Sequence, residues 1–144
     1  MPAAAPCLKI LHVDDDRINL FVLDQLLGML GHAPTGVGTA LEALELLDTK
    51  VFDLVLTDVH MPELSGMDLL TACRERLGEA APPVVAVTAD VMSWREHEFR
   101  ELGFAGVITK PLIADELVRL LAAVSAPAET RAFAAAGLRK RGQK

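Results

Sequence analysis

Cysteine and long apolar runs are scarce in this sequence, and each scarcity excludes a class of protein. The two cysteines, Cys7 and Cys73, lie far apart, without the spacing of a metal site or a disulfide framework, so we expect reduced thiols. No apolar run approaches the roughly 18 residues that a membrane span requires, and the first residues lack the basic and apolar segments of a secretion signal. We therefore predict a soluble, cytoplasmic protein.

Basic residues are sparse until the end of the chain. Residues 126–144 hold five basic residues and one acidic residue, which gives +4 within a total of −6, so residues 1–125 carry −10. An acidic body does not bind nucleic acid unaided, and the Ala-rich tail lacks the aromatic residues of a nucleic-acid-binding arm. We predict an N-terminal extension at 1–7, one compact domain at 8–125 and a solvated tail at 126–144, with neither nucleic acid nor membrane as a partner.

Short β-branched runs alternate with amphipathic stretches through the central part of the chain. The β-branched runs predict strands covered on both faces, at 8–13, 52–57, 83–88 and 106–109. Helices are predicted by cap signals at Asp16, at Thr39 with Glu42 and at Ser65 with Asp68, and by periodicity over 92–102 and 115–124. Alternation also requires a strand at 32–38, despite Pro34, Gly36 and Gly38. The pattern predicts an α/β fold with a doubly wound, five-stranded parallel sheet and helices on both faces.

Polar residues follow the predicted strands at their carboxyl ends, where such sheets bind ligands. Asp14 and Asp15 follow the first run, Asp58 the third, Thr88 closes the fourth and Lys110 follows the last. Several carboxylates at one edge favour a hard cation, and an all-oxygen set with room for water suits Mg²⁺ rather than zinc. A lysine and a hydroxyl beside Mg²⁺ suit a phosphoryl group, which a carboxylate can accept as an aspartyl phosphate.

Four motifs occur in order and at matching spacing: "VDDD", "LVLTDVHMPELSG", "VVAVTAD" and "GVITKPL". Through them the sequence resembles the response-regulator receiver domains of two-component and phosphorelay signalling, over residues 8 to about 124. The resemblance implies the flavodoxin-like receiver fold with strand order 2-1-3-4-5. It also implies a signalling phosphoacceptor rather than an enzyme beyond its own phosphorylation and dephosphorylation, with a histidine kinase or histidine phosphotransfer protein as partner.

The resemblance assigns roles to individual residues. It implies that Asp58 is the phosphoacceptor and that Asp14, Asp15, Asp58 and the main-chain carbonyl of His60 hold Mg²⁺, for which Mn²⁺ can substitute. Thr88 matches the hydroxyl that meets the phosphoryl group and shifts on activation, and Lys110 matches the lysine that pairs with that group. A cis peptide is implied between Lys110 and Pro111. Asp16 is interpreted as a helix cap.

Several positions depart from the family pattern or vary within it. Many receivers have an aromatic residue where this chain has Val107, and the sequence contains no tyrosine, so an aromatic switch is not expected and the switch rests on Thr88. His60 and Asp90 lie two residues after Asp58 and Thr88, where family members tune the lifetime of the phosphoryl group. His12 replaces a common aliphatic residue, and we predict a partly buried histidine without a chemical role.

The first predicted helix has apolar residues on two faces. A leucine stripe suits the sheet, which turns Ile18, Phe21 and Gln25 outward, with Val22 and Met29 flanking them. An exposed apolar surface beside the acidic edge suggests docking of the phosphohistidine-bearing partner through Ile18, Phe21, Val22 and Gln25. The alternative is that other parts of the chain cover this helix.

Two alternative functions are a hydrolase and a scaffold, and a separate question is whether the chain stands alone. A hydrolase with an aspartyl nucleophile would need a second carboxylate where His60 stands, and a degenerate scaffold would lack the acceptor, lysine or acidic pair. Met1 and the free tail favour a stand-alone regulator over a fragment of a hybrid histidine kinase. The kinase, the pathway and the downstream protein partner do not follow from the sequence.

Overall fold

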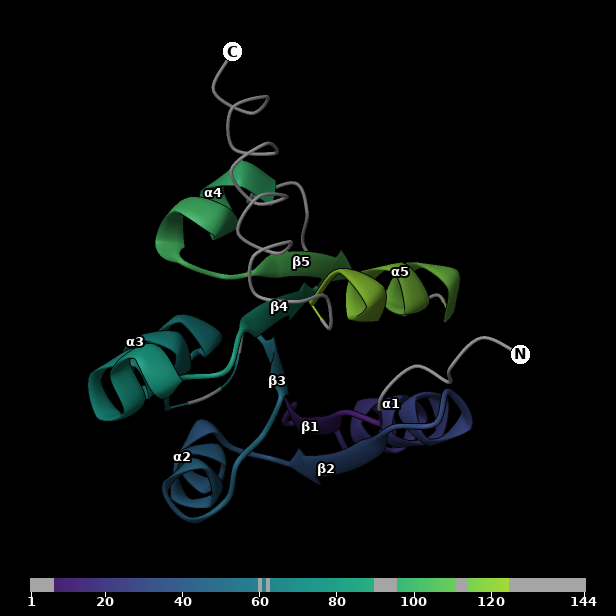
Figure 1. The fold of residues 1–144 in the computed structure, drawn as a ribbon, viewed down its shortest axis with the longest axis horizontal. Helices are drawn as coiled ribbons and strands as arrows, with labels where there is room; N and C mark the ends of the chain where they lie inside the picture. The colour runs from purple at the N-terminus through teal and green to yellow at the C-terminus, as the bar shows by residue number, and fades with distance from the viewer. Residues whose placement is uncertain (1–6, 60, 62, 90–95, 111–113, 125–144) are drawn as a thin grey trace.

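The computed structural model describes residues 7–59, 61, 63–89, 96–110 and 114–124, which form one layered α/β unit (Figure 1). Five parallel strands form one sheet in the order β2-β1-β3-β4-β5. The strands are β1 Lys9–Val13, β2 Ala33–Val37, β3 Leu54–Asp58, β4 Val84–Thr88 and β5 Gly106–Thr109. The helices are α1 Arg17–Met29, α2 Ala40–Thr49, α3 Gly66–Leu77, α4 Glu96–Leu102 and α5 Ala114–Val124, with a short 3₁₀ turn, η1, at Gly78–Ala80. The predicted fold class and strand order are confirmed.

Two helical layers cover the sheet on opposite sides, as Figure 1 shows. On the α1–α5 face, Leu23 and Leu27 of α1 and Leu117 and Leu121 of α5 pack against aliphatic strand residues. On the α2–α4 face, α2, α3 and Phe99 of α4 pack against the opposite side chains of the same strands. This double covering explains why the strands appear as continuous apolar runs in the sequence. No helix among the described residues is long and apolar enough to cross a membrane.

Strand β2 forms although its sequence, "APTGV", contains a proline and a glycine. The strand lies at the edge of the sheet, where a proline is tolerated because only one side of the strand must supply ladder hydrogen bonds. Gly36 lies beside His12 of β1, and a Cβ at Gly36 would come within 2.7 Å of Cε1 of the His12 ring. The glycine therefore leaves the space that the buried imidazole fills.

The predicted caps set the starts of three helices. The Asp16 carboxylate accepts hydrogen bonds from the main-chain N–H groups of Ile18 and Asn19, at 2.8 and 3.4 Å, so its interpretation as a cap is correct. Ser65 and Asp68 form a complete capping box at α3. At α2 the Thr39 hydroxyl accepts from the Glu42 N–H, while the Glu42 carboxylate meets that same hydroxyl at 3.3 Å. The helix predicted over 92–102 is described from Glu96 onward, and its first four residues lie outside the described part of the chain.

Candidate functional site

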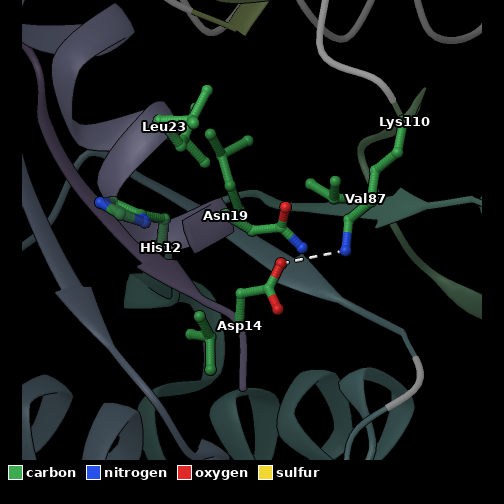
Figure 2. A pocket seen from close by; sticks show the side chains of 9 residues that line it. His12, Asp14, Asn19, Leu23, Val87 and Lys110 are labelled. Carbon is green, nitrogen blue, oxygen red and sulfur yellow. Dashed lines mark hydrogen bonds and ion pairs between the residues drawn. The ribbon is translucent and has the colours of Figure 1, made fainter. Parts of the chain in front are cut away.

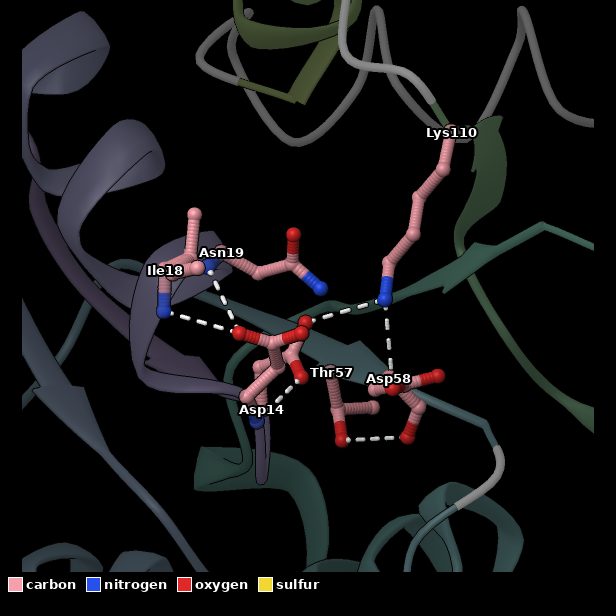
Figure 3. Close-up of polar contacts among 7 residues, drawn as sticks. Asp14, Ile18, Asn19, Thr57, Asp58 and Lys110 are labelled. Carbon is pink, nitrogen blue, oxygen red and sulfur yellow. Dashed lines mark hydrogen bonds and ion pairs between the residues drawn. The ribbon is translucent and has the colours of Figure 1, made fainter.

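The carboxyl ends of four strands converge on one edge of the sheet, drawn in Figure 3. Asp58 and Thr88 are the last residues of β3 and β4, while Asp14 and Lys110 directly follow β1 and β5. The Lys110 N–H donates to the Thr88 carbonyl at 2.9 Å, which aligns the last two strands at this edge. Because the strands are parallel and adjacent, residues that are up to 96 positions apart in sequence meet at one site.

Lys110 links the two most buried carboxylates of the edge. Its Nζ donates to Oδ2 of Asp14 at 3.0 Å and to Oδ2 of Asp58 at 3.2 Å, and each aspartate is only 8% exposed. Burial alone would lower the pKa of the Lys110 ammonium, but hydrogen bonds and charge attraction from Asp14 and Asp58 outweigh it and raise the pKa above its ordinary value. The lysine therefore stays charged and offsets part of the negative charge at this edge.

Three carboxylates at this edge fit a divalent cation. Asp14, Asp15 and Asp58 each offer a carboxylate oxygen, and these oxygens lie within 4.8 Å of one another. Asp15 is exposed, so one side of the cluster is open to water. An open, all-oxygen set with few protein ligands matches Mg²⁺, which keeps several of its waters when bound to proteins. The donor chemistry therefore agrees with the predicted magnesium site.

The remaining groups near Asp58 are packed tightly. Thr88 is completely buried at the end of β4, and the Thr57 hydroxyl donates to the Asp58 carbonyl at 3.0 Å. A Cβ at Gly66 would come within 2.6 Å of that same carbonyl oxygen, so the start of α3 can approach Asp58 only through a residue without a side chain. Gly66 was not singled out from the sequence, although its place just after the Ser65 cap was the available signal.

A cavity of about 230 Å³ adjoins the acidic edge beneath α1, as Figure 2 shows. Its walls combine Leu23 and Val87 with the polar side chains of His12, Asp14, Asn19 and Lys110. His12 is 1% exposed, more buried than predicted, and its Nε2 lies 2.6 Å from Oδ1 of Asp24 on α1. Burial lowers the pKa of His12 despite the nearby Asp24 carboxylate. Neither Asp24 nor Asn19 was identified from the sequence, because both contacts depend on how α1 packs on β1.

The other predicted residues lie in three places. Val107 is half-buried in the middle of β5 and packs against the α2–α4 face. Ile18, Phe21, Val22 and Gln25 are exposed on α1, with Ile18 73% and Phe21 65% exposed, and Val22 also lines the cavity. His60, Asp90 and the peptide between Lys110 and Pro111 lie outside the described residues, wholly or in part.

Comparison of the sequence with known protein families identifies the family of this fold and this site. Residues 10–122 match the sequence profile of the response regulator receiver domain. The chain belongs to that receiver family. The match includes β1 from its second residue, the other four strands and nearly all of α5, so the family assignment applies to nearly the whole described unit of this receiver.

Curated relatives of the receiver are much longer sensor proteins. It is 32% identical over 117 residues to the aerobic respiration control sensor protein ArcB of Escherichia coli K12, covering 81% of this chain and 15% of that protein. It is 36% identical over 115 residues to the sensor histidine kinase RcsC of Salmonella typhi, covering 80% of this chain and 12% of that protein. The chain thus spans less than a sixth of the length of these relatives.

Solved structures show the same architecture. The receiver domain of a Pseudomonas aeruginosa PAO1 sensor histidine kinase, with a magnesium ion coordinated in its active-site cleft, is 26% identical with a TM-score of 0.72, covering 81% of this chain and 95% of that one. The chemotaxis response regulator CheY4 of Vibrio cholerae has a TM-score of 0.74 at 24% identity, covering 83% and 99% of the two chains, and supports the fold alone.

Proposed function

We propose that this receiver is a cytoplasmic signalling phosphoacceptor, which takes a phosphoryl group from a phosphohistidine onto the Asp58 carboxylate. The observation that carries the proposal is the bridge from Lys110 to both Asp14 and Asp58 at an open acidic edge. In this arrangement the Lys110 ammonium lies beside the Asp58 carboxylate. It would also offset the negative charge of a phosphoryl group bound to that carboxylate. Family membership supports the same assignment.

Three acidic side chains and one main-chain carbonyl are the proposed metal ligands. Asp14, Asp15 and Asp58 would hold Mg²⁺ together with the main-chain carbonyl of His60, and Mn²⁺ would fit the same oxygen ligands. When bound, the cation would supply positive charge to the oxygens of the transferring group. A related receiver binds magnesium in its cleft, which supports this choice of metal.

Beside the bound cation, the side chains at this edge act directly on the transferring group. An Asp58 oxygen attacks phosphorus as the phosphorus–nitrogen bond of the donor breaks, and the bonding pair stays on the imidazole nitrogen, which takes a proton from solvent water. Lys110 offsets the charge on the phosphoryl oxygens, and the Thr88 hydroxyl donates to one of them. Activation then rests on Thr88, with Val107 in place of an aromatic switch, while His60 and Asp90 would tune how long the phosphoryl group persists.

Labelling by a small phosphodonor tests the phosphoacceptor assignment. Incubation with acetyl phosphate and Mg²⁺ is expected to add one phosphoryl group to the wild-type chain and none to Asp58→Asn, as read by intact mass. Asp15→Asn should weaken Mg²⁺ binding in a calorimetric titration, because it removes one charged ligand. Equal labelling of wild type and Asp58→Asn would refute the choice of acceptor.

The partner is a histidine kinase or a histidine phosphotransfer protein, and we place its docking surface on the outer side of α1. Ile18, Phe21, Val22 and Gln25 form this surface, which lies beside the acidic edge. Ile18, Phe21 and Val22 are apolar and yet exposed. Large apolar side chains gain free energy when a partner covers them, and such groups dominate the centres of interfaces. A helix of the partner would fit against α1.

A charge placed on this surface should separate docking from chemistry. Phe21→Asp is expected to slow transfer from the cognate partner about tenfold or more, while labelling by acetyl phosphate continues. Val51→Asp is the matched control, because Val51 is 81% exposed just before β3, at the amino-terminal edge of the sheet. Loss of both activities in Phe21→Asp would indicate misfolding, and retention of both would show that the partner docks elsewhere.

A further inference from the structure

Asn19 lies in the first turn of α1, three residues after the Asp16 cap. Its main-chain N–H is bound by the cap, so this part of the residue belongs to the helix start. Helical side chains lean toward the helix N-terminus, which here faces the carboxyl edge of the sheet. Figures 2 and 3 show the Asn19 carboxamide extending toward the Asp14 carboxylate and the Lys110 ammonium. The three residues line one cavity.

The Asn19 carboxamide makes no hydrogen bond to any residue that the structure describes, although an amide can donate two and accept two. An asparagine in a first turn often bonds to the local backbone, but here the Asp16 carboxylate already serves that purpose. The side chain is half-buried, so it is held near the site rather than extended into solvent. Its hydrogen-bonding capacity is therefore available to a group that enters the cavity.

The space beside Asn19 holds water-sized groups and meets the acidic edge at Asp14, whereas Asp15 and Asp58 do not line it. The cavity of about 230 Å³ has room for several water molecules, at about 30 Å³ each in the liquid. Magnesium gives up its waters reluctantly, and residues that hydrogen-bond to the waters or ligands of a metal change its affinity by about 10–100-fold. A neutral amide oxygen accepts a hydrogen bond from such a water without adding charge beside Asp14. Figure 2 draws the amide nitrogen of Asn19 toward the site, and a half-turn of the carboxamide brings the oxygen there.

We propose that Asn19 is a further binding residue of the site, whose carboxamide hydrogen-bonds the water shell of the divalent cation from the α1 side. The inference rests on the proposed function, because it requires that Asp14, Asp15 and Asp58 hold the cation. It extends the site from the strand ends to the helix that carries the proposed docking surface. Asn19 would then connect cation binding to the position of α1.

Calorimetric titration of Mg²⁺ into the full chain tests the role of Asn19. Asn19→Ala is expected to raise the Kd for Mg²⁺ about tenfold or more, since the cation loses a partner for its water shell. Asn19→Asp is expected to lower the Kd, because the isosteric carboxylate adds charge at the same place. An acidic residue in the first turn favours the helix, so this variant should remain folded.

Arg17→Gln is the matched control, because it changes the net charge by the same amount as Asn19→Asp from the exposed first residue of α1. Its Kd should stay within about twofold of the wild type. Equal Kd values for Asn19→Ala and wild type would overturn the proposal, as would equal shifts in Asn19→Asp and Arg17→Gln. If Asp15→Asn also left the Kd unchanged, the proposed magnesium site itself would be wrong, and the two failures are thereby distinguished.

Discussion

The two faces of the sheet are packed with different kinds of side chain. On the α2–α4 face, Phe52, Phe99 and Phe104 join the aliphatic residues, and the rings of Phe99 and Phe104 meet edge to face with centroids 5.8 Å apart. On the α1–α5 face the described core is aliphatic, and beside it lie the buried His12 and the cavity that reaches Asp14 and Lys110. The polar cavity that adjoins the proposed site therefore lies on the α1–α5 face.

This difference suggests that the two faces have different roles. The α2–α4 face also has a pocket, of about 190 Å³, but its lining, which includes Leu70, Cys73 and Val84, contains no residue of the acidic edge. The cavity beneath α1 instead lets water and ligands approach Asp14 and Lys110. Helix α1 lies over that cavity, contributes Asn19 to it and exposes Phe21 on its outer side. Binding events at the acidic edge and on the outer side of α1 would therefore both act on the α1–α5 face.

Matched leucine deletions on the two faces give the largest expected effect. Leu69→Ala, in α3, is expected to lower the free energy of unfolding by about 4 kcal/mol, because Leu69 is completely buried on the α2–α4 face. Leu23→Ala should cost only about 2–3 kcal/mol, because Leu23 already borders the cavity. Urea denaturation measures both costs, and equal values would show that the two faces are equally well packed.

A methyl group at Gly36 tests how tightly His12 is enclosed. Gly36→Ala is expected to lower the free energy of unfolding by about 2 kcal/mol, because the new Cβ would lie 2.7 Å from Cε1 of the His12 ring. The cost should largely disappear in a His12→Ala background, where the ring is gone. A cost that persists in the double variant would place the strain elsewhere.

Removing the partner of His12 should have a smaller effect. Asp24→Ala is expected to cost about 1–2 kcal/mol, because it leaves the buried Nε2 of His12 without its acceptor. The same substitution in a His12→Leu background should cost little, since no polar group then remains to be satisfied. A double-mutant cycle from urea denaturation gives the coupling, and a coupling of zero would mean that the 2.6 Å contact does not stabilise the fold.

Protonation of His32 should give the smallest effect. Its Nδ1 accepts the Leu8 N–H at 3.1 Å, which requires an unprotonated nitrogen, and burial lowers its pKa from the ordinary 6.5. The unfolded chain therefore binds the proton more readily, so stability falls as the pH drops below about 6.5. His32→Asn keeps an acceptor and should reduce this fall when urea midpoints at about pH 7.5 and 5.5 are compared. An unchanged fall would assign it to other groups, such as His12.

The sequence predicted the parts of the molecule that depend on local pattern. Asp16, Ser65 and Asp68 were identified as caps because capping acts over three residues, and the strand ends located Asp14, Asp58 and Lys110 at one edge. The place of Asn19 in the cavity wall and the contact of Asp24 with His12 were missed, because both depend on the rotation of α1 against β1. His12 was expected to be partly exposed, whereas the gap left by Gly36 on the neighbouring strand allows its complete burial. Such pairings between distant residues cannot be read from periodicity.

The proline in β2 has a consequence for how the molecule behaves at high concentration. The Ala33 N–H points inward to the Leu8 carbonyl, and successive main-chain groups of a strand point to opposite sides, so position 34 is one whose N–H would point outward. Pro34 has no N–H, and the free edge of the sheet therefore lacks a donor at its second residue. An incoming strand from another molecule would find this edge interrupted, which protects the fold against edge-to-edge aggregation.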